Sequence, residues 1–525
     1  MNFQTRNYFI KEGRLKRENE KTTYPFVFEV GEDIGEIQID FGYSPKILKD
    51  RSRNYQKIKA AVEEYTKEVV IPRQRTLVFN YFLREAYPLR NLLNLSLHNP
   101  EGRFVGRWDW NSERPVRISS AYSSPGFTPG KIISGSWTGE MEVHAIVTEE
   151  CRYRLKISLI EKRDKEGSGS SKKKLIKKSS LRHEKGWYGG ELHVHSHHSD
   201  GKNTVEEIVE AARKEKLDFI SLTDHNTVSG FSSIPNGGGL LVIRGMELTT
   251  YYGHALALGL NSFVNWHSQG TTRNINQIID EVHAQRGLFA MAHPFSIGDS
   301  VCAGCTWKLG NVDYHKLDLM EVWAGCWKER KIENSRALRL WNELLNQGFK
   351  VVGISGRDWH DVNEKKAHIP RTFVYADSLS EPKILEGLRQ GRVIVSSGPI
   401  VSLSAKYGDR KYQYGDEINL REKRPLSFQI QIENLKGPSE LQVIKNGLRF
   451  CNFSLAKGES HRISFSDLPE GNSWYRCEIY TENEELLCVT NPIFLSSYRE
   501  NARQNVPRQV RTGAKNQERC TGKKK

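Results

Sequence analysis

The sequence has no long apolar run. None of its hydrophobic stretches approaches the roughly 20 residues that a membrane-spanning helix needs. The first residues, Met1 to Arg6, do not lead into the apolar segment of a signal peptide. We therefore expect a soluble, cytoplasmic protein without a membrane partner.

Cysteine is scarce, with 8 residues scattered over 525 positions. This count excludes a disulfide-rich secreted scaffold and agrees with a reducing compartment. One close pair, Cys302 and Cys305, has a spacing found in some zinc and redox sites, but a lone pair of this kind is weak evidence. We expect two free thiols in a glycine-containing surface loop.

The formal net charge of +15 is concentrated in two segments. Residues 161–185 carry ten Lys and Arg against four Asp and Glu, and residues 498–525 carry nine against two. The remainder is close to neutral, so a basic face for DNA is not supported. We predict a flexible linker at 161–185 and a disordered tail at 498–525. Contact with nucleic acid or another polyanion is the less favoured alternative.

Two flanking regions have the alternating pattern of β-strands. In residues 1–160, Leu93, Leu95 and Leu97 alternate with polar residues, and one helix is expected around Ile58 and Val62. Residues 399–497 alternate in the same way and contain an Asn446-Gly447 hairpin turn. We predict a β-sandwich-like domain on each side, with no recognisable catalytic motif in the first.

Residues 186–398 change to apolar strands that alternate with amphipathic helices, which predicts the α/β class. Seven such strands suggest a closed, parallel β/α barrel, one unit short of the usual eight. The predicted strands are Gly190–His195, Phe219–Thr223, Leu240–Gly245, His254–Gly259, Leu288–Ala292, Leu319–Trp323 and Val351–Ser355.

Metal-ligand residue types lie at or near the ends of nearly all these strands, where a parallel barrel places its active site. His193 and His195 are two apart on a strand and so point to the same face, and Asp200 follows in the loop. Residues 193–368 hold 12 of the 16 histidines, which chance explains poorly. The other strand ends carry Asp224, His225, Glu247, His254, His293, Arg357, Asp358 and His360.

The ordered segments HxH…SDG, TDHN, GxE, GH, AHP and GxDxH resemble the PHP family, the polymerase-and-histidinol-phosphatase metal-dependent hydrolases, over roughly residues 190–400. The continuation through Arg371–Tyr375, Gly387–Arg392 and Ser397–Pro399 is similar to the branch named for a carbaryl hydrolase. That branch often joins the barrel to β domains. The resemblance implies a distorted seven-stranded barrel that holds up to three divalent ions, for which imidazole and carboxylate ligands suit Zn, Mn or Fe.

The resemblance also implies a ligand set and a nucleophile. A metal-bound hydroxide would attack the substrate, without a serine or cysteine nucleophile, and a carboxylate could bridge two ions. His254 is the least secure ligand because it begins its strand. One ion would take His193, His195, Glu247 and Asp358; a second would share Glu247 and add His254 and His293; a third would take Asp200, His225 and His360.

Two residues are candidates for a role in catalysis with alternatives left open. Asp224 could donate a proton to the leaving group or orient neighbouring groups, and orientation is favoured. Arg357 stands where relatives usually carry a small residue, and its guanidinium could bind a substrate anion or pair with a neighbouring acid. His197 and His198 are expected to face solvent.

The leading hypothesis is a metal-dependent phosphoesterase that acts on a small phosphorylated substrate. The alternative keeps the same metal site and hydrolyses a carbamate, ester or amide. A non-catalytic binding protein ranks last, because all nine expected ligand positions are filled. The segment 296–312 is expected to form a lid, and the pattern does not fix the oligomeric state.

Overall fold

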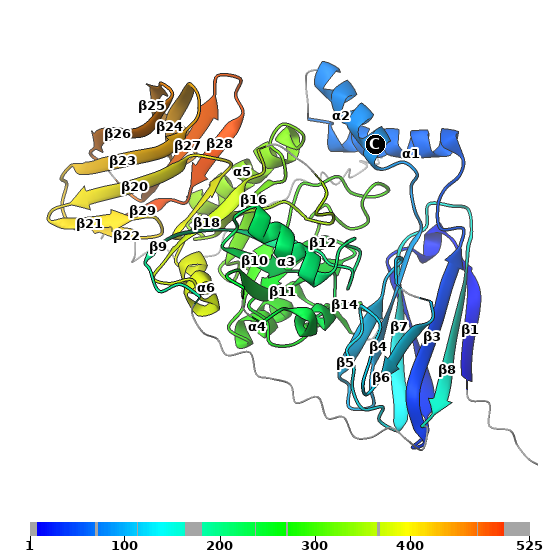
Figure 1. The fold of residues 1–525 in the computed structure, drawn as a ribbon. Coiled ribbons are helices and arrows are strands. Elements are labelled where there is room, and N and C mark those ends of the chain that lie inside the picture. Colours follow the sequence, from blue (N-terminus) through cyan, green and yellow to red (C-terminus); the bar gives the residue numbers. More distant parts are fainter. Residues whose placement is uncertain are drawn as a thin grey trace, which may run out of the picture.

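The computed structural model describes residues 8–497 apart from 69–71, 113, 163–180, 237, 269–270, 365–367 and 470. A central α/β unit lies between two β modules, one formed by the N-terminal part of the chain and one by the C-terminal part (Figure 1). Most of the predicted basic linker and all of the predicted tail lie outside the described residues. Within the described ranges, no helix combines the length and the apolar character that crossing a bilayer requires.

The N-terminal module consists of two four-stranded sheets, ordered β1-β8-β3-β6 and β2-β7-β4-β5, that share one hydrophobic core. Leu93, Leu95 and Leu97 are fully buried in this core, as their alternation predicts. The strands are β1 (Tyr8–Leu15), β2 (Thr22–Val30), β3 (Ile34–Ser44), β4 (Leu92–His98), β5 (Phe104–Trp108), β6 (Val116–Ser119), β7 (Gly135–Ala145) and β8 (Cys151–Glu161).

Two helices, α1 (Arg51–Tyr65) and α2 (Pro72–Glu85), interrupt this module between β3 and β4. The sequence pattern predicts the first and misses the second. Ile58 and Val62 of α1 are buried in a small core that also contains Ile297 of the central unit. The helical pair therefore connects the N-terminal module to the segment that was expected to form a lid.

The central unit contains all seven predicted strands and the two predicted amphipathic helices. In α3, Thr204 caps the first turn in a capping box with Glu207, and the apolar stripe that begins at Val205 is buried. The elements are β9 (Gly186–Val194), α3 (Val205–Lys214), β10 (Phe219–Leu222), β11 (Leu241–Thr250), β12 (Gly253–Leu258), α4 (Ile275–Ala284), β15 (Leu288–Met291), β16 (Leu319–Ala324), α5 (Lys331–Asn346), β17 (Val352–Gly356), β18 (Arg371–Ala376), α6 (Glu381–Arg389) and β19 (Val393–Ser396).

One strand runs against the direction that the parallel-barrel prediction gives it. Strands β9, β10 and β11 are mutually parallel, as are β15, β16 and β17, but β12 is antiparallel to both β11 and β15. Only Tyr251 and Tyr252 separate β11 from β12. A connection this short can only form a hairpin, because a parallel neighbour requires a crossover of a dozen or more residues.

Side chains join the two sides of the sheet where a closed barrel would have a backbone ladder. The described ladder ends at β17, and β9 continues instead into β18 and β19. The Asn491 amide donates to the carbonyls of Gly353 in β17 and Val393 in β19, and it accepts from the Gly353 N–H. The Thr372 hydroxyl contacts the backbone of Ser355 in the same way. We call these contacts the seam.

The C-terminal module shares a sheet with the central unit, because β19 pairs with β28. A second, four-stranded sheet, β21-β20-β23-β26, packs on the same core. The strands are β20 (Ile400–Tyr407), β21 (Arg410–Gln413), β22 (Glu417–Leu420), β23 (Leu426–Leu435), β24 (Ser439–Lys445), β25 (Leu448–Leu455), β26 (Gly458–Asp467), β27 (Ser473–Thr481), β28 (Leu486–Thr490) and β29 (Ile493–Ser497).

Candidate metal centre

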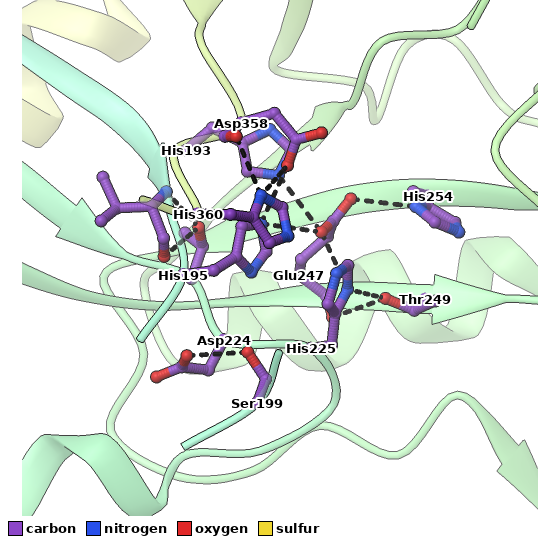
Figure 2. Close-up of polar contacts among 12 residues, drawn as sticks. His193, His195, Ser199, Asp224, His225, Glu247, Thr249, His254, Asp358 and His360 are labelled. Carbon is purple, nitrogen blue, oxygen red and sulfur yellow. Dashed lines mark hydrogen bonds and ion pairs between the residues drawn. The ribbon is translucent and has the colours of Figure 1, made fainter. Parts of the chain in front are cut away.

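The predicted ligands lie at one edge of the central sheet, where the parallel strands end. Figure 2 labels all of them except Asp200 and His293. His193 lies in β9, His225 follows β10, and His225 bridges to Glu247 of β11. Because β12 is antiparallel, its first residues lie at this same edge, and His254 pairs with Thr249. His254 was the least secure predicted ligand because it begins its strand. Since β12 is antiparallel, the beginning of this strand lies at the ligand edge, and the objection no longer applies.

The nine predicted ligand residues come together in three groups, within each of which the ligand atoms lie within 4.8 Å of one another. The third group contains His195 in addition to the three residues expected for it. We call them the first group (His193, His195, Glu247 and Asp358), the second group (Glu247, His254 and His293) and the open group (His195, Asp200, His225 and His360).

Glu247 is the centre of the arrangement and is fully buried. Its Oε2 lies 3.1 Å from Nε2 of His193 and 3.3 Å from Nε2 of His195. Its Oε1 lies 3.1 Å from both Nδ1 of His254 and Nε2 of His293. One carboxylate therefore faces the first group with one oxygen and the second group with the other, which is the placement that a bridging ligand needs.

Solvent reaches the open group and Asp358 of the first group, whose side chain is 25% exposed. The side chains of Asp200 and His360 are 25% and 32% exposed, and that of His225 is 14% exposed, whereas His193 and Glu247 have no exposure. Oδ1 of Asp200 lies 3.1 Å from Nε2 of His360 and 3.5 Å from Nε2 of His225. A substrate would thus meet the open group and Asp358 before the second group.

The residues present fit divalent metal ions. Several of their buried atoms have no hydrogen-bond partner, among them Nε2 of His193, His195 and His254, and Oε2 of Glu247. An unsatisfied buried polar atom costs about 1–3 kcal/mol, so a cluster of them at one point indicates a missing ligand. Imidazole together with carboxylate is a donor set that binds Zn, Mn and Fe.

The charge states of Glu247 and His195 suit metal ligands. Burial would raise the pKa of Glu247, but the imidazoles of His225 and His193 hold it well below its usual value, so the carboxylate stays ionised. Burial, together with His360 and His225, lowers the pKa of His195 to about 4, so this imidazole is neutral at pH 7. An ionised carboxylate and a neutral imidazole are the forms that bind a metal.

Glu321 in β16 supports the site and escapes the sequence prediction. Its Oε1 lies 2.9 Å from Nδ1 of His193, and its Oε2 accepts a 2.7 Å hydrogen bond from the His293 N–H. A Cβ at Gly356 would lie 1.9 Å from Oε1 of Glu321, so the neighbouring strand needs glycine there. The only available signal is a single glutamate within an otherwise apolar predicted strand.

Asp224 is buried and fixes the loop that carries Asp200. Its Oδ1 accepts hydrogen bonds from the Ser196 N–H at 2.7 Å and from the Ser199 hydroxyl at 2.8 Å, and Oδ2 accepts from the Ser196 hydroxyl at 2.8 Å. Both oxygens are therefore occupied by the histidine-rich loop. This geometry favours the orienting alternative over proton donation to a leaving group.

Of the two roles left open for Arg357, binding of a substrate anion or pairing with a neighbouring acid, the structure shows the pairing. Its guanidinium donates to both carboxylate oxygens of Glu215 at 3.0–3.2 Å, and it stacks on the Trp359 ring with its carbon 3.4 Å from the ring centroid. The backbone N–H of Arg357 donates to the Glu191 carboxylate. Burial raises the pKa of this carboxylate to about 7. These contacts leave no support for Arg357 as an anchor of the substrate.

Two expectations about this region are wrong. His198 does not face solvent: it is buried, and its Nδ1 lies 2.8 Å from the Ser229 hydroxyl. Cys302 and Cys305 are not free thiols, because a disulfide joins them. His197 is half-buried beside the Asn203 carbonyl.

The N-terminal module contacts several of the loops at the ligand edge. The Gly126 N–H donates to His198 at 3.3 Å, and the Thr227 hydroxyl donates to the Gly126 carbonyl at 3.1 Å. The Tyr251 hydroxyl, in the hairpin between β11 and β12, donates to the Thr22 carbonyl at 2.8 Å. The N-terminal module therefore forms part of the surroundings of the site.

Comparisons with known proteins agree with the resemblance in the sequence. Residues 191–279 match the family model of the PHP domain. An uncharacterized protein of Methanocaldococcus jannaschii is 26% identical over 175 residues, which are 31% of this chain and 96% of that protein. A phosphoribosyl 1,2-cyclic phosphate 1,2-diphosphodiesterase of Eggerthella lenta is 34% identical over 64 residues, which are 12% of this chain and only 24% of that protein. A two-domain Bacteroides vulgatus structure, described as containing a predicted PHP-like metal-dependent phosphoesterase, aligns at TM-score 0.35 and 17% identity, covering 59% of this chain and 96% of that one.

Proposed function

We propose that this protein is a metal-dependent hydrolase that cleaves a phosphoester bond in a small substrate. The observation that carries this proposal is the convergence of nine imidazole and carboxylate residues into three adjacent groups at one sheet edge. The match of residues 191–279 to the PHP domain supports it. We also propose that the protein is cytoplasmic. We assign its central unit to a distorted seven-stranded barrel, which the side-chain contacts of the seam close.

The chain's own residues would hold and position the reacting groups. Divalent ions, Zn, Mn or Fe, would supply Lewis acidity and lower the pKa of a water when bound. Glu247 keeps a negative charge between the first and second groups, while Glu321 orients the His193 ring. Asp224 holds the loop of Asp200 in place, so that the open group presents a fixed face to the substrate.

A small substrate fits better than a polymer. The N-terminal module contacts the loops around His198 and Thr227 and the hairpin at Tyr251, so part of the ligand edge is already covered. Nucleic acid is therefore not favoured as a partner. The alternative of carbamate, ester or amide hydrolysis uses the same residues, and the similarity of residues 371–399 to the carbaryl-hydrolase branch keeps it as the second candidate.

Metal analysis coupled to a substrate panel tests the proposal. The purified protein should contain divalent metal and should hydrolyse p-nitrophenyl phosphate faster than aryl esters or carbamates. Asp358→Asn should abolish both metal binding and turnover. Asp361→Asn is the matched control, because Asp361 lies in the same loop but pairs with Lys202 at 2.8 Å. Full activity in Asp358→Asn would refute the proposal, and a preference for carbamates would select the alternative.

A further inference from the structure

Arg330 is a positively charged residue beside the candidate metal centre and does not belong to the three ligand groups. It is the N-cap residue of α5, and its backbone N–H donates to the Cys326 carbonyl at 3.0 Å. Gly325, at the end of β16, donates its N–H to the Gly356 carbonyl, which places it two residues from Asp358 along the neighbouring strand. A Cβ at Gly325 would lie 3.2 Å from Cδ and Nε of Arg330. The Arg330 side chain therefore lies across the ligand edge.

The guanidinium is only partly neutralised by its surroundings. Its Nε lies 3.3 Å from Oε1 of Glu333, and within the described residues its two Nη atoms have no hydrogen bond or ion pair. The side chain is 24% exposed, so these Nη atoms have access to solvent. Burial would lower the pKa of Arg330, but the charges of Glu333 and Asp358 raise it.

The N-terminal module covers this cluster. The Tyr65 hydroxyl, at the end of α1, lies 3.5 Å from Oε2 of Glu333. Glu333 itself is buried and interacts electrostatically with His293 of the second group. Glu333 thus links Arg330 to Tyr65 of α1, and we call these three residues the Arg330 cluster.

We propose that the two free Nη atoms of Arg330 bind a non-bridging oxygen pair of the substrate's phosphate group beside Asp358. This inference rests on the proposed function and narrows it to anionic substrates. A guanidinium presents two parallel N–H donors that match two phosphate oxygens. Ions bound to Asp358 would neutralise that carboxylate, which leaves the Arg330 charge available for an incoming anion. A neutral carbamate or ester would gain nothing from this contact.

Inorganic phosphate binding and steady-state kinetics on the metal-loaded, full-length protein test the inference. Arg330→Gln should weaken phosphate binding and raise KM for p-nitrophenyl phosphate about ten- to hundredfold, the range for a lost hydrogen bond to a charged group. Its hydrolysis of a neutral aryl ester, if the wild type shows any, should change less than threefold. Arg330→Lys should restore part of the phosphate affinity, because it keeps the charge but loses the paired donors.

The matched control is Arg336→Gln on the same helix. Its guanidinium lies over the Tyr65 ring at 5.6 Å and pairs with Glu68 at 3.5 Å. It therefore contacts the same part of the N-terminal module as the Arg330 cluster, but it does not lie at the ligand edge. Metal content should be unchanged in all three variants. Unchanged phosphate affinity and KM in Arg330→Gln would overturn the inference while leaving the hydrolase intact. A wild type that binds phosphate in an Arg330-dependent way but hydrolyses no phosphoester would instead refute the proposed function. Equal losses on phosphate and neutral ester would show that Arg330 is only structural.

Discussion

Replacement of Glu321 by glutamine should weaken metal binding without unfolding the protein. Glu321 is 1% exposed and contacts two ligand residues at once, through Nδ1 of His193 at 2.9 Å and the N–H of His293 at 2.7 Å. Glutamine keeps the shape but has one acceptor oxygen and one NH₂ group. In the variant, one of the two contacts would therefore either place the glutamine NH₂ group against another hydrogen-bond donor or be lost.

The size of the effect follows from that exchange. A hydrogen bond to a charged group contributes about 1.5–3 kcal/mol, which corresponds to roughly a 10- to 100-fold change in an equilibrium constant. The same range is typical when a residue that orients a metal-binding histidine is replaced. We therefore expect the metal affinity of Glu321→Gln to fall about 10- to 100-fold.

A chelator-competition titration, with metal content read by elemental analysis, measures this directly. The control is Glu281→Gln, because Glu281 pairs with Arg273 at 2.7 Å away from the ligand groups. Thermal unfolding of the metal-free proteins should show that Glu321→Gln still folds. Wild-type metal affinity in a folded Glu321→Gln protein would refute the assignment of Glu321 as the residue that orients His193.

Two further outcomes are expected. Burial would lower the pKa of His267, but Glu140 and Glu142 raise it to about 9. The charge of His267 therefore stabilises the fold fully below pH 6.5, and this stabilisation is lost as the pH rises through 9. Relative to a His267→Gln variant, the free energy of unfolding of the wild type should fall by on the order of 3 kcal/mol between pH 6 and 10 in denaturant titrations, and a constant difference would contradict this. Removal of metal by a chelator should lower the melting temperature, since a ligand at 100 times its Kd stabilises by about 2.7 kcal/mol, and an unchanged melting curve would show that no ion binds the folded protein.

The strand ends could be read from the sequence, but the direction of one strand could not. Alternation and apolar runs mark a strand without giving its orientation, so His254 looked misplaced until β12 proved antiparallel. The short link of Tyr251 and Tyr252 carried that information and was overlooked. The residues predicted as ligands could be picked out because they occur in ordered segments, each attached to a strand end, and the structure brings them together.

The supporting residues were harder to predict because each depends on a contact between distant segments. Glu321 is separated from His193 by 128 positions and stands alone in an apolar strand. The burial of His198 and the covering of the ligand edge both arise from contacts with the N-terminal module, at Gly126 and Thr22. Such contacts leave no periodic pattern. Arg357 is the converse case, where an unusual residue suggested chemistry and forms an ion pair with Glu215 instead.

The seam has a consequence for any attempt to divide the chain. A polypeptide that stops at the predicted boundary near residue 398 would lack Asn491 and the partner strand β28. Strand β19 would then present an unpaired edge, and the Gly353 N–H and carbonyl would lose their partner. Unpaired edges of this kind promote self-association through strand addition. A polypeptide of residues 186–398 should therefore aggregate when expressed alone, although it contains every predicted metal ligand.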